Sequence, residues 1–117
     1  MKCLVTGANG FLGTNLVIAL CEQGWQVYAS GRTTQANPFI ADLPISYQSL
    51  DITDAQGVDA AVRNVDVVFH VAGDTSFWKP LYPQQRATNV DGTLNVAHTC
   101  LKHGKRMVHT STADVFG

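Results

Sequence analysis

The sequence predicts an α/β fold in which five parallel strands form a doubly wound sheet. Short apolar runs alternate along the chain with longer segments that have helical periodicity. The first apolar run passes directly into a glycine-rich turn that opens a helical segment. Strands and helices that alternate in this way form a parallel sheet with right-handed crossovers. The expected strand order is 3-2-1-4-5, with ligands bound between strands one and four.

Length and composition indicate one globular domain over residues 1–117. The chain has 117 residues, 45% of them hydrophobic and 15% charged, and a formal net charge of −1. Because there is no excess of positive charge, neither nucleic acid nor a membrane is an expected partner. The three cysteines follow no disulfide or metal-ligand spacing, so we expect no metal site and a cytoplasmic location.

The N-terminal part predicts three strands and one strong helix. The strands are Lys2–Thr6, Gln26–Ser30 and Ile45–Leu50. The helix spans Gly10–Gln23, with Leu12, Leu16 and Leu20 on its inward face and Gly24 as its stop. Residues 31–43 are rich in turn-forming residues and are expected to be an irregular connection.

The C-terminal part predicts two more helices and two more strands. Residues 53–56 fit a capping box that opens a helix with Val58, Ala61 and Val62 facing inward. The near-continuous apolar run Asp66–Ala72 predicts a central strand, with His70 as a core histidine. A helix over Gln84–His103, with apolar residues at helical spacing, and a fifth strand over Met107–Ser111 complete the pattern. The spaced apolar residues are Val90, Leu94, Ala97 and Leu101.

The glycine-rich turn is the most informative segment. It reads Thr-Gly-Ala-Asn-Gly-Phe-Leu-Gly over residues 6–13, where the first strand passes into the first helix. Glycines there allow a tight turn and let a pyrophosphate approach the helix N-terminus. The cofactor-binding candidates in this segment are Gly7, Asn9, Gly10, Phe11, Leu12 and Gly13. The first two glycines are three apart, which departs from the common Gly-x-Gly-x-x-Gly pattern.

This turn resembles the nucleotide-binding turn of the extended short-chain dehydrogenases/reductases. That family includes the NAD-dependent epimerases/dehydratases, dihydroflavonol reductases and 3β-hydroxysteroid dehydrogenases. Stretches at residues 51–54, 69–73, 89–93 and 111–117 match further family motifs in the same order, so the resemblance covers the whole chain. The sequence around residues 69–78 is similar to the dihydroflavonol-reductase and hydroxysteroid-dehydrogenase branch.

The resemblance implies further site residues. Asp51 is expected to meet the adenine with Ile52 as its apolar neighbour, although an acid before a helix can also be a simple cap. The strand-four end and the later motifs imply cofactor contacts at Val71, Ala72, Gly73, Thr75 and Asn89. The family's catalytic hydroxyl falls on Thr112, with Ser111 as the neighbour that could take the role. A hydroxyl that only completes a strand end is the alternative for both.

The end of the second strand favours NADP(H) over NAD(H). No Asp or Glu occurs between Glu22 and Asp42, where NAD enzymes of this fold carry an acid for the ribose 2′-hydroxyl. Residues 30–33 are Ser-Gly-Arg-Thr instead, and the Arg32 guanidinium suits a 2′-phosphate. A solvated loop cation is the alternative interpretation of Arg32.

The family's catalytic Tyr-x-x-x-Lys does not occur in the chain. Four residues after Tyr28, Tyr47 and Tyr82 come Arg32, Asp51 and Arg86. We therefore expect the chain to be the N-terminal, Rossmann-like part of a longer oxidoreductase or epimerase. This part is expected to bind cofactor without turnover, and the longer enzyme is expected to act on a small-molecule substrate. The alternatives are a non-catalytic module that senses NADP(H) and a decayed gene product that binds no ligand well. A sheet that ends at the fifth strand also predicts a homodimer covering the open edge.

Overall fold

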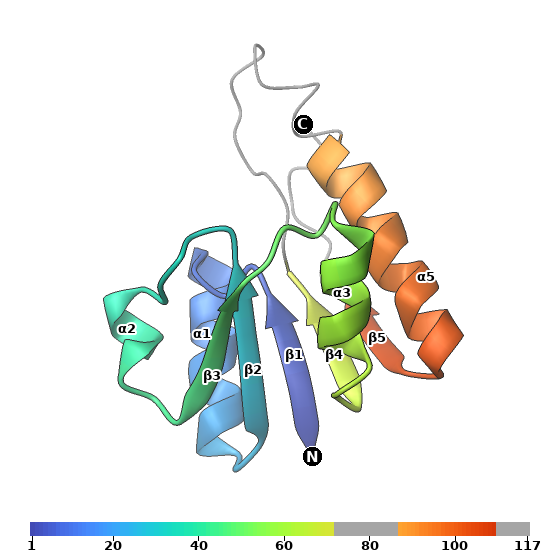
Figure 1. The fold of residues 1–117 in the computed structure, drawn as a ribbon. Helices are drawn as coiled ribbons and strands as arrows, with labels where there is room; N and C mark the ends of the chain where they lie inside the picture. Colours follow the sequence, from blue (N-terminus) through green and yellow to red (C-terminus); the bar gives the residue numbers. More distant parts are fainter. Residues whose placement is uncertain (72–86, 110–117) are drawn as a thin grey trace, which may run out of the picture.

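Five parallel strands form one sheet in the order β3-β2-β1-β4-β5 (Figure 1). The structure, a computed structural model, describes residues 1–71 and 87–109. The strands are β1 (Lys2–Thr6), β2 (Gln26–Gly31), β3 (Ile45–Ser49), β4 (Val67–His70) and β5 (Arg106–His109). The predicted fold class and strand order are confirmed.

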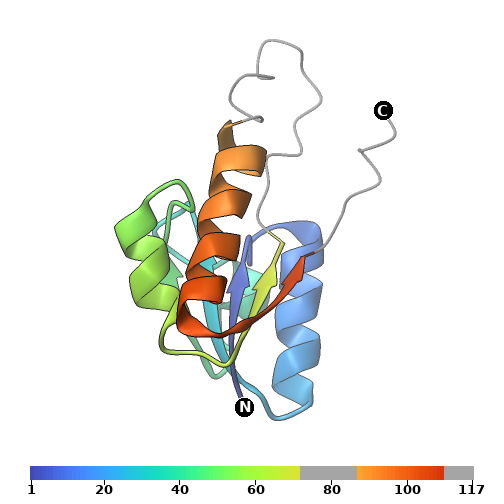
Figure 2. The ribbon, with the colours of Figure 1, turned by 90° about the vertical axis from the view of Figure 1, so that its right-hand side faces the viewer.

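Helices cover both faces of the sheet. The helices are α1 (Phe11–Glu22), α2 (Pro38–Ala41), α3 (Ala55–Val62) and α5 (Thr93–His103), the last preceded by the π-helical turn η2 (Ala87–Gly92). Figure 2 shows α1 on one side of the sheet and α3 with α5 on the other. Right-handed crossovers produce this division, because connections from β1 to β3 and from β3 to β5 run in opposite directions across the sheet.

The core forms on both faces of the central strand β1. Cys3 and Val5 point into the cluster beneath α1, and Leu4 points into the cluster beneath α3 and α5. This alternation is the period of two that a strand imposes on its side chains. All three residues are at most 3% exposed, which fits a strand buried on both sides.

Helix α1 confirms part of its predicted inward face, since Leu20 is buried and Leu16 packs against the core. Gly13, Thr14, Val17 and Leu20 are buried, whereas Leu12 is 46% exposed and Leu16 is half-buried. The reason is the close approach of Gly13 to the backbone of Gly7 and Ala8, which turns this side of the helix inward. The stop at Gly24 is confirmed by its φ of 81°.

One prediction about a helix start is wrong, and one connection contains a short helix that was not predicted. Thr53 does not cap α3, because its hydroxyl donates to Asp51 at 2.7 Å and the N-cap residue is Asp54, which makes no side-chain cap bond. Residues 38–41 form the short helix α2 within the segment expected to be irregular. Its start has Asn37 as N-cap and proline in the first turn, a combination that favours helix initiation.

Helix α5 packs through Val96 and Cys100, which are 1% and 3% exposed. The apolar series at helical spacing points away, with Leu94 50% and Leu101 81% exposed. Asp59 of α3 holds the end of α5 through Lys102 at 3.1 Å and His103 at 2.8 Å. No helix in residues 1–71 and 87–109 has the length and apolar character that crossing a bilayer requires.

Candidate functional site

The glycine-rich turn joins the carboxyl end of β1 to the N-terminus of α1. Gly7 has a φ of 67°, and its carbonyl accepts a hydrogen bond from the Gly10 N–H at 3.1 Å. A Cβ on Gly13 would lie 2.8 Å from the Gly7 carbonyl carbon and nearer still to its oxygen. Only glycine at position 13 therefore lets α1 start this close to the turn.

The N-terminus of α1 provides donors that suit a phosphate. Its N-cap, Gly10, makes no side-chain cap bond, and the first turn has no acidic residue. The first N–H groups of a helix have no intrahelical acceptor, and the helix dipole favours an anion there. The donor set and the space left by the glycines therefore fit a pyrophosphate.

The side chain of Asn9 connects this turn to residues 31–37, the connection after β2. Its Oδ1 accepts a hydrogen bond from the Asn37 backbone N–H at 2.8 Å. Its Nδ2 lies 2.6 Å from Thr33 Oγ1 and 3.0 Å from the Tyr47 hydroxyl, to which its two hydrogens can donate, and 3.2 Å from the Gln35 carbonyl oxygen. Asn9, a predicted cofactor residue, is thus engaged with protein partners from two other segments.

Asn37 strengthens the same connection from the other side. Its Oδ1 accepts from the Phe39 N–H at 2.9 Å, and its Nδ2 donates to Thr14 Oγ1 at 2.8 Å. Thr14 in turn donates to the Ala8 carbonyl at 2.9 Å. One asparagine therefore joins the start of α2, the first turn of α1 and, through its backbone N–H, Asn9.

Arg32 and Asp51 lie at neighbouring strand ends. Arg32 follows β2 and is exposed; its carbonyl accepts a hydrogen bond from Ser49 Oγ at 3.4 Å. Asp51 is also exposed, and its Oδ1 accepts from the Thr53 hydroxyl at 2.7 Å and the Thr53 N–H at 3.0 Å. These hydrogen bonds, assisted by the charge of Arg32, lower the pKa of the Asp51 carboxyl. An ionised acceptor and a cation therefore share this edge of the sheet.

Ile52 packs on the start of α5. Its side chain is 5% exposed, and a Cβ on Gly92 would lie 2.5 Å from its Cγ1. Asn95 Nδ2 donates to the Ile52 carbonyl at 3.0 Å. The loop after β3 is thus fixed to the helix that begins after the η2 turn.

His70 links β4 to β1 and to the start of α5. Its ring is 0% exposed, with Nδ1 2.9 Å from Thr6 Oγ1 and Nε2 3.0 Å from Thr93 Oγ1. Thr6 Oγ1 also accepts the Val71 N–H at 3.0 Å. Burial, with a contribution from His109, lowers the pKa of His70 to about 4. The predicted core location of this histidine is confirmed.

A family model described as the NAD dependent epimerase/dehydratase family matches residues 3–117. The chain belongs to this family.

Two curated relatives of this family member are named as reductases. It is 40% identical over 116 residues to a 2-alkyl-3-oxoalkanoate reductase of Stenotrophomonas maltophilia, covering 98% of this chain and 34% of the relative. It is 35% identical over 114 residues to a putative dihydroflavonol 4-reductase of Synechocystis, covering 97% and 33%. The chain thus spans about a third of the length of these relatives.

A solved structure of an enzyme with bound NAD aligns over the whole chain. The Bordetella bronchiseptica enzyme WbmG in complex with NAD gives a TM-score of 0.87 at 27% identity, covering 100% of this chain and 39% of that one. The chain therefore has the fold of an enzyme whose structure was solved with NAD.

The predicted site residues divide into three groups in this family member. Gly7, Asn9, Gly10, Phe11, Leu12 and Gly13 lie at the turn, and Arg32, Asp51, Ile52 and Val71 follow the ends of β2, β3 and β4. Ala72, Gly73, Thr75, Ser111 and Thr112 lie outside the described residues. The backbone of Asn89 belongs to η2, and its side chain is outside the description.

Sequence reasoning missed the polar residues that fix these segments to one another. They are Thr33, Asn37, Tyr47 and Asn95. A local signal existed only for Asn37, where Asn-Pro marks a helix start. The other three act through partners that are distant in sequence.

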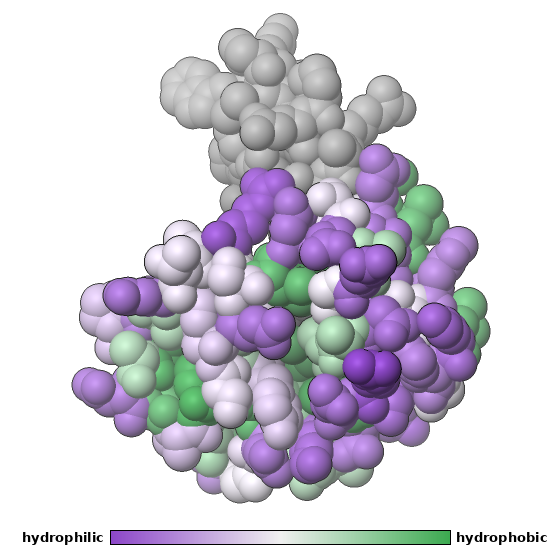
Figure 3. All heavy atoms as spheres, in the orientation of Figure 1, coloured by the Kyte–Doolittle hydropathy of each residue, from purple (hydrophilic) through white to green (hydrophobic). Residues whose placement is uncertain are grey.

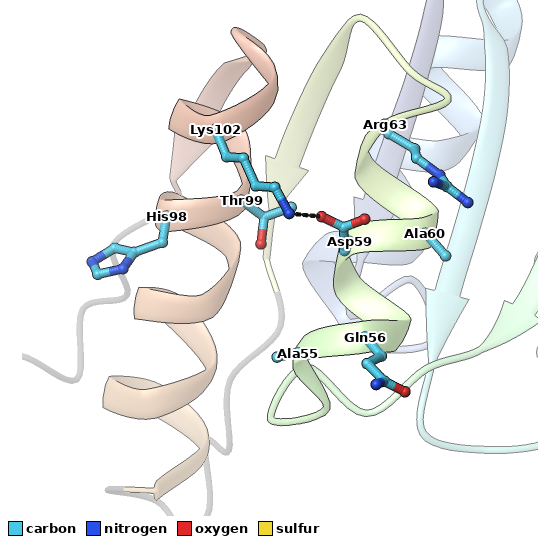
Figure 4. A pocket seen from close by; sticks show the side chains of 8 residues that line it. All are labelled: Ala55, Gln56, Asp59, Ala60, Arg63, His98, Thr99 and Lys102. Carbon is cyan, nitrogen blue, oxygen red and sulfur yellow. Dashed lines mark hydrogen bonds and ion pairs between the residues drawn. The ribbon is translucent and has the colours of Figure 1, made fainter.

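A separate hollow lies between the outer surfaces of α3 and α5. It measures about 470 Å³, and Figure 4 shows Asp59 facing Lys102 across it. Hydrophilic residues gather over these helices in the space-filling view (Figure 3). Because its lining includes no residue of the glycine-rich turn, this hollow is distinct from the candidate cofactor site.

Proposed function

We propose that this chain binds NADP(H) and forms the cofactor-binding part of an oxidoreductase or epimerase that acts on a small organic substrate. The observation that carries the proposal is the close packing of Gly13 on Gly7, which brings the uncapped N-terminus of α1 to the carboxyl end of β1. Ligands of doubly wound sheets bind at this edge, where the strand order reverses between β1 and β4.

The pyrophosphate is assigned to the backbone N–H groups of the turn. Gly7, Gly10 and Gly13 leave room for it, and the Phe11 and Leu12 side chains are 89% and 46% exposed at the same helix start. Asp51 and Val71 are assigned to the adenosine side and the strand-four side of the cofactor. The backbone of Ile52 is assigned to the adenine, because the Ile52 side chain already packs on Gly92. We also propose that the cofactor contacts Ala72, Gly73, Thr75 and Asn89.

Arg32 is assigned to the ribose 2′-phosphate. It follows β2 at the position where an acid would select NAD(H), and neither Gly31 nor Thr33 beside it is acidic. A guanidinium binds a phosphate through two parallel hydrogen bonds, whereas a carboxylate there would repel it.

Hydride transfer is the chemistry that a nicotinamide cofactor supplies when bound. Thr112, or Ser111 beside it, would hold the reacting oxygen of the substrate by a hydrogen bond. The chain contains no Tyr-x-x-x-Lys, so we propose that residues 1–117 alone bind cofactor without turnover. The names of the two curated relatives support a carbonyl or hydroxyl substrate.

Calorimetric titration with NADPH and NADH tests the proposal. We expect wild type to bind NADPH more tightly, and Arg32→Ala to lower NADPH affinity roughly 10- to 100-fold, the range of a lost charge-assisted hydrogen bond. NADH affinity should change little. Arg63→Ala, at the exposed end of α3, is the control and should leave both affinities unchanged. Equal losses for the two dinucleotides in Arg32→Ala would contradict the assignment.

We also propose a homodimer that covers the edge strand β5. Val108 is 41% exposed on this strand, which is an edge of the sheet in the part of the chain that the structure describes, and an exposed strand edge favours pairing with another chain. Light scattering should give twice the chain mass at high concentration. A monomer mass throughout the concentration range would contradict this.

A further inference from the structure

We propose that Tyr47 is a positioning residue that sets the selectivity of this site for the ribose 2′-substituent of the cofactor. The inference rests on the proposed function and adds a residue with no place in the family motifs of the sequence. Tyr47 lies in β3, and its hydroxyl is within hydrogen-bond distance of groups from two other segments.

The direction of each hydrogen bond around Tyr47 follows from the groups that can only donate or only accept. The Asn37 backbone N–H must donate, so the oxygen of the Asn9 amide faces it and the Asn9 NH₂ group faces Tyr47 and Thr33. The Tyr47 hydroxyl donates to the Thr33 carbonyl at 2.8 Å and accepts from Asn9 at 3.0 Å.

Thr33 completes the network without a conflict. Its hydroxyl donates to the Gln35 carbonyl at 2.9 Å and accepts from Asn9 Nδ2 at 2.6 Å. Each hydroxyl hydrogen therefore has an acceptor, and the Asn9 and Thr33 side chains are held in one orientation. A polar network in which all members are satisfied restricts the conformations of the residues that form it.

The main chain on both sides of Arg32 is bonded to β3 and to the residue that follows it. The Gly31 carbonyl accepts the Leu50 N–H at 2.8 Å, and the Thr33 carbonyl accepts the Tyr47 hydroxyl at 2.8 Å. The hydroxyl of Tyr47 is thus the side-chain donor that holds the residue following Arg32. Without it, the backbone after Arg32 loses a partner in β3 while the backbone before it keeps its own.

Gly31 leaves the space that this arrangement needs. A Cβ on Gly31 would lie 2.9 Å from the Tyr47 hydroxyl oxygen and 3.2 Å from Asn9 Nδ2. An alanine there would therefore press on the same hydroxyl that Tyr47→Phe removes. Both substitutions disturb the Tyr47 hydroxyl by different means, and Gly31→Ala also approaches Asn9 Nδ2. Comparing them tests the part of the effect that depends on the hydroxyl.

The consequence is specific to one end of the cofactor. Asn9 keeps its bonds to Asn37 when the Tyr47 hydroxyl is removed, so the glycine-rich turn retains a link to residues 31–37. The affected backbone is that of Thr33, next to Arg32. We therefore expect Tyr47→Phe to weaken binding of a 2′-phosphate and to spare binding of the pyrophosphate.

Calorimetry on the full chain with NADPH, NADH and 2′,5′-ADP measures this. Tyr47→Phe should lower affinity for NADPH and 2′,5′-ADP about fivefold, as expected for one net hydrogen bond, with less than a twofold change for NADH. Tyr28→Phe is the matched control, because the Tyr28 hydroxyl accepts a hydrogen bond from Gln26 Nε2 at 3.0 Å and its ring packs against the opposite core cluster. Tyr28→Phe should leave all three affinities unchanged.

Gly31→Ala provides a second measurement. As a single substitution, Gly31→Ala should reproduce the loss of NADPH selectivity expected for Tyr47→Phe. In the Tyr47→Phe background it should cause a smaller loss, because phenylalanine has no hydroxyl to displace. Thermal melting of each variant reports its folding separately. Additive effects of the two substitutions on selectivity would contradict the proposed contact.

The possible results separate the two proposals. Suppose that wild type prefers NADPH and that Tyr47→Phe weakens the binding of NADPH and NADH equally, or changes the binding of neither. Tyr47 then has no role in selectivity, so this inference is wrong while the proposed function stands. If wild type binds neither dinucleotide, or binds NADH more tightly, the proposed NADP(H) function is wrong and the inference falls with it.

Discussion

The hydroxyl of Thr6 lies 2.9 Å from Nδ1 of His70, and this contact joins the carboxyl ends of β1 and β4 at the point where the strand order reverses. The two residues are also register partners in the parallel pairing of these strands. Because Thr6 precedes Gly7, a buried histidine directly supports the start of the glycine-rich turn. The protonation of His70 should therefore matter for stability.

Removal of the His70 imidazole should flatten the acid dependence of stability. Burial lowers the pKa of His70 from its ordinary 6.5 to about 4 in the folded chain. Between these values the unfolded chain binds more protons, so the free energy of unfolding falls as the pH falls from about 6.5 towards 4. The loss amounts to at most about 3 kcal/mol.

Urea unfolding of wild type and His70→Gln between pH 8 and 4.5 measures this effect. The difference in unfolding free energy between the two should be largest near neutral pH and shrink on acidification. His98→Gln is the control, since this side chain is exposed on α5. A wild-type minus His70→Gln difference that stays constant with pH would show that His70 does not titrate on unfolding in this range.

Addition of a methyl group at Gly13 should be far more damaging than at Gly10. The new Cβ at position 13 would meet backbone atoms of Gly7 and Ala8, which cannot move without moving the turn, whereas at position 10 its nearest contact is Gly7 O at 3.4 Å. We expect Gly13→Ala to cost about 1–3 kcal/mol or more of unfolding free energy and to abolish NADPH binding. Gly10→Ala should cost less than about 1 kcal/mol.

Thermal melting and calorimetry compare the two alanine variants directly. Because both substitutions add the same atom within one turn, general effects of alanine on the unfolded chain cancel in the comparison. Equal melting temperatures for Gly13→Ala and Gly10→Ala would mean that the close approach of α1 to the turn is not needed.

The fold and the position of the site could be predicted because they depend on short-range patterns. The spacing of Gly7, Gly10 and Gly13 and the apolar run before them lie within a dozen residues. The strand order then followed from the handedness of crossovers. On α1 the prediction holds for Leu20 and fails for Leu12, which is exposed because the contact that orients the helix belongs to Gly13.

The polar connections could not be predicted because their partners are far apart in sequence. Asn9 bonds to Thr33 and Tyr47, which are 24 and 38 residues away. A hydroxyl or amide in a sequence has many possible partners, and only the folded sheet brings β3 beside the glycine-rich turn. Thr53 shows the same limit locally, since its hydroxyl bonds to Asp51 in place of the expected helix cap.

Loss of the Asn37 side chain should destabilise the chain more than loss of a similar asparagine elsewhere. Asn37→Ala removes the N-cap bond to Phe39 at 2.9 Å and the bond to Thr14 at 2.8 Å. An N-cap contributes about 1 kcal/mol, and the half-buried Thr14 contact adds a comparable amount, so we expect a loss of about 2 kcal/mol. Denaturant unfolding at neutral pH measures it.

Asn64→Ala is the matched control for this substitution. Asn64 is exposed and donates one side-chain bond, to the Ala60 carbonyl at 3.1 Å, at the end of α3. Its replacement should cost less than about 0.5 kcal/mol, in line with surface sites. Because Asn37 also joins α2 to the first turn of α1, its variant should weaken NADPH and NADH binding alike, which distinguishes it from Tyr47→Phe. Equal unfolding free energies for the two alanine variants would mean that the link between α1 and α2 adds nothing to stability.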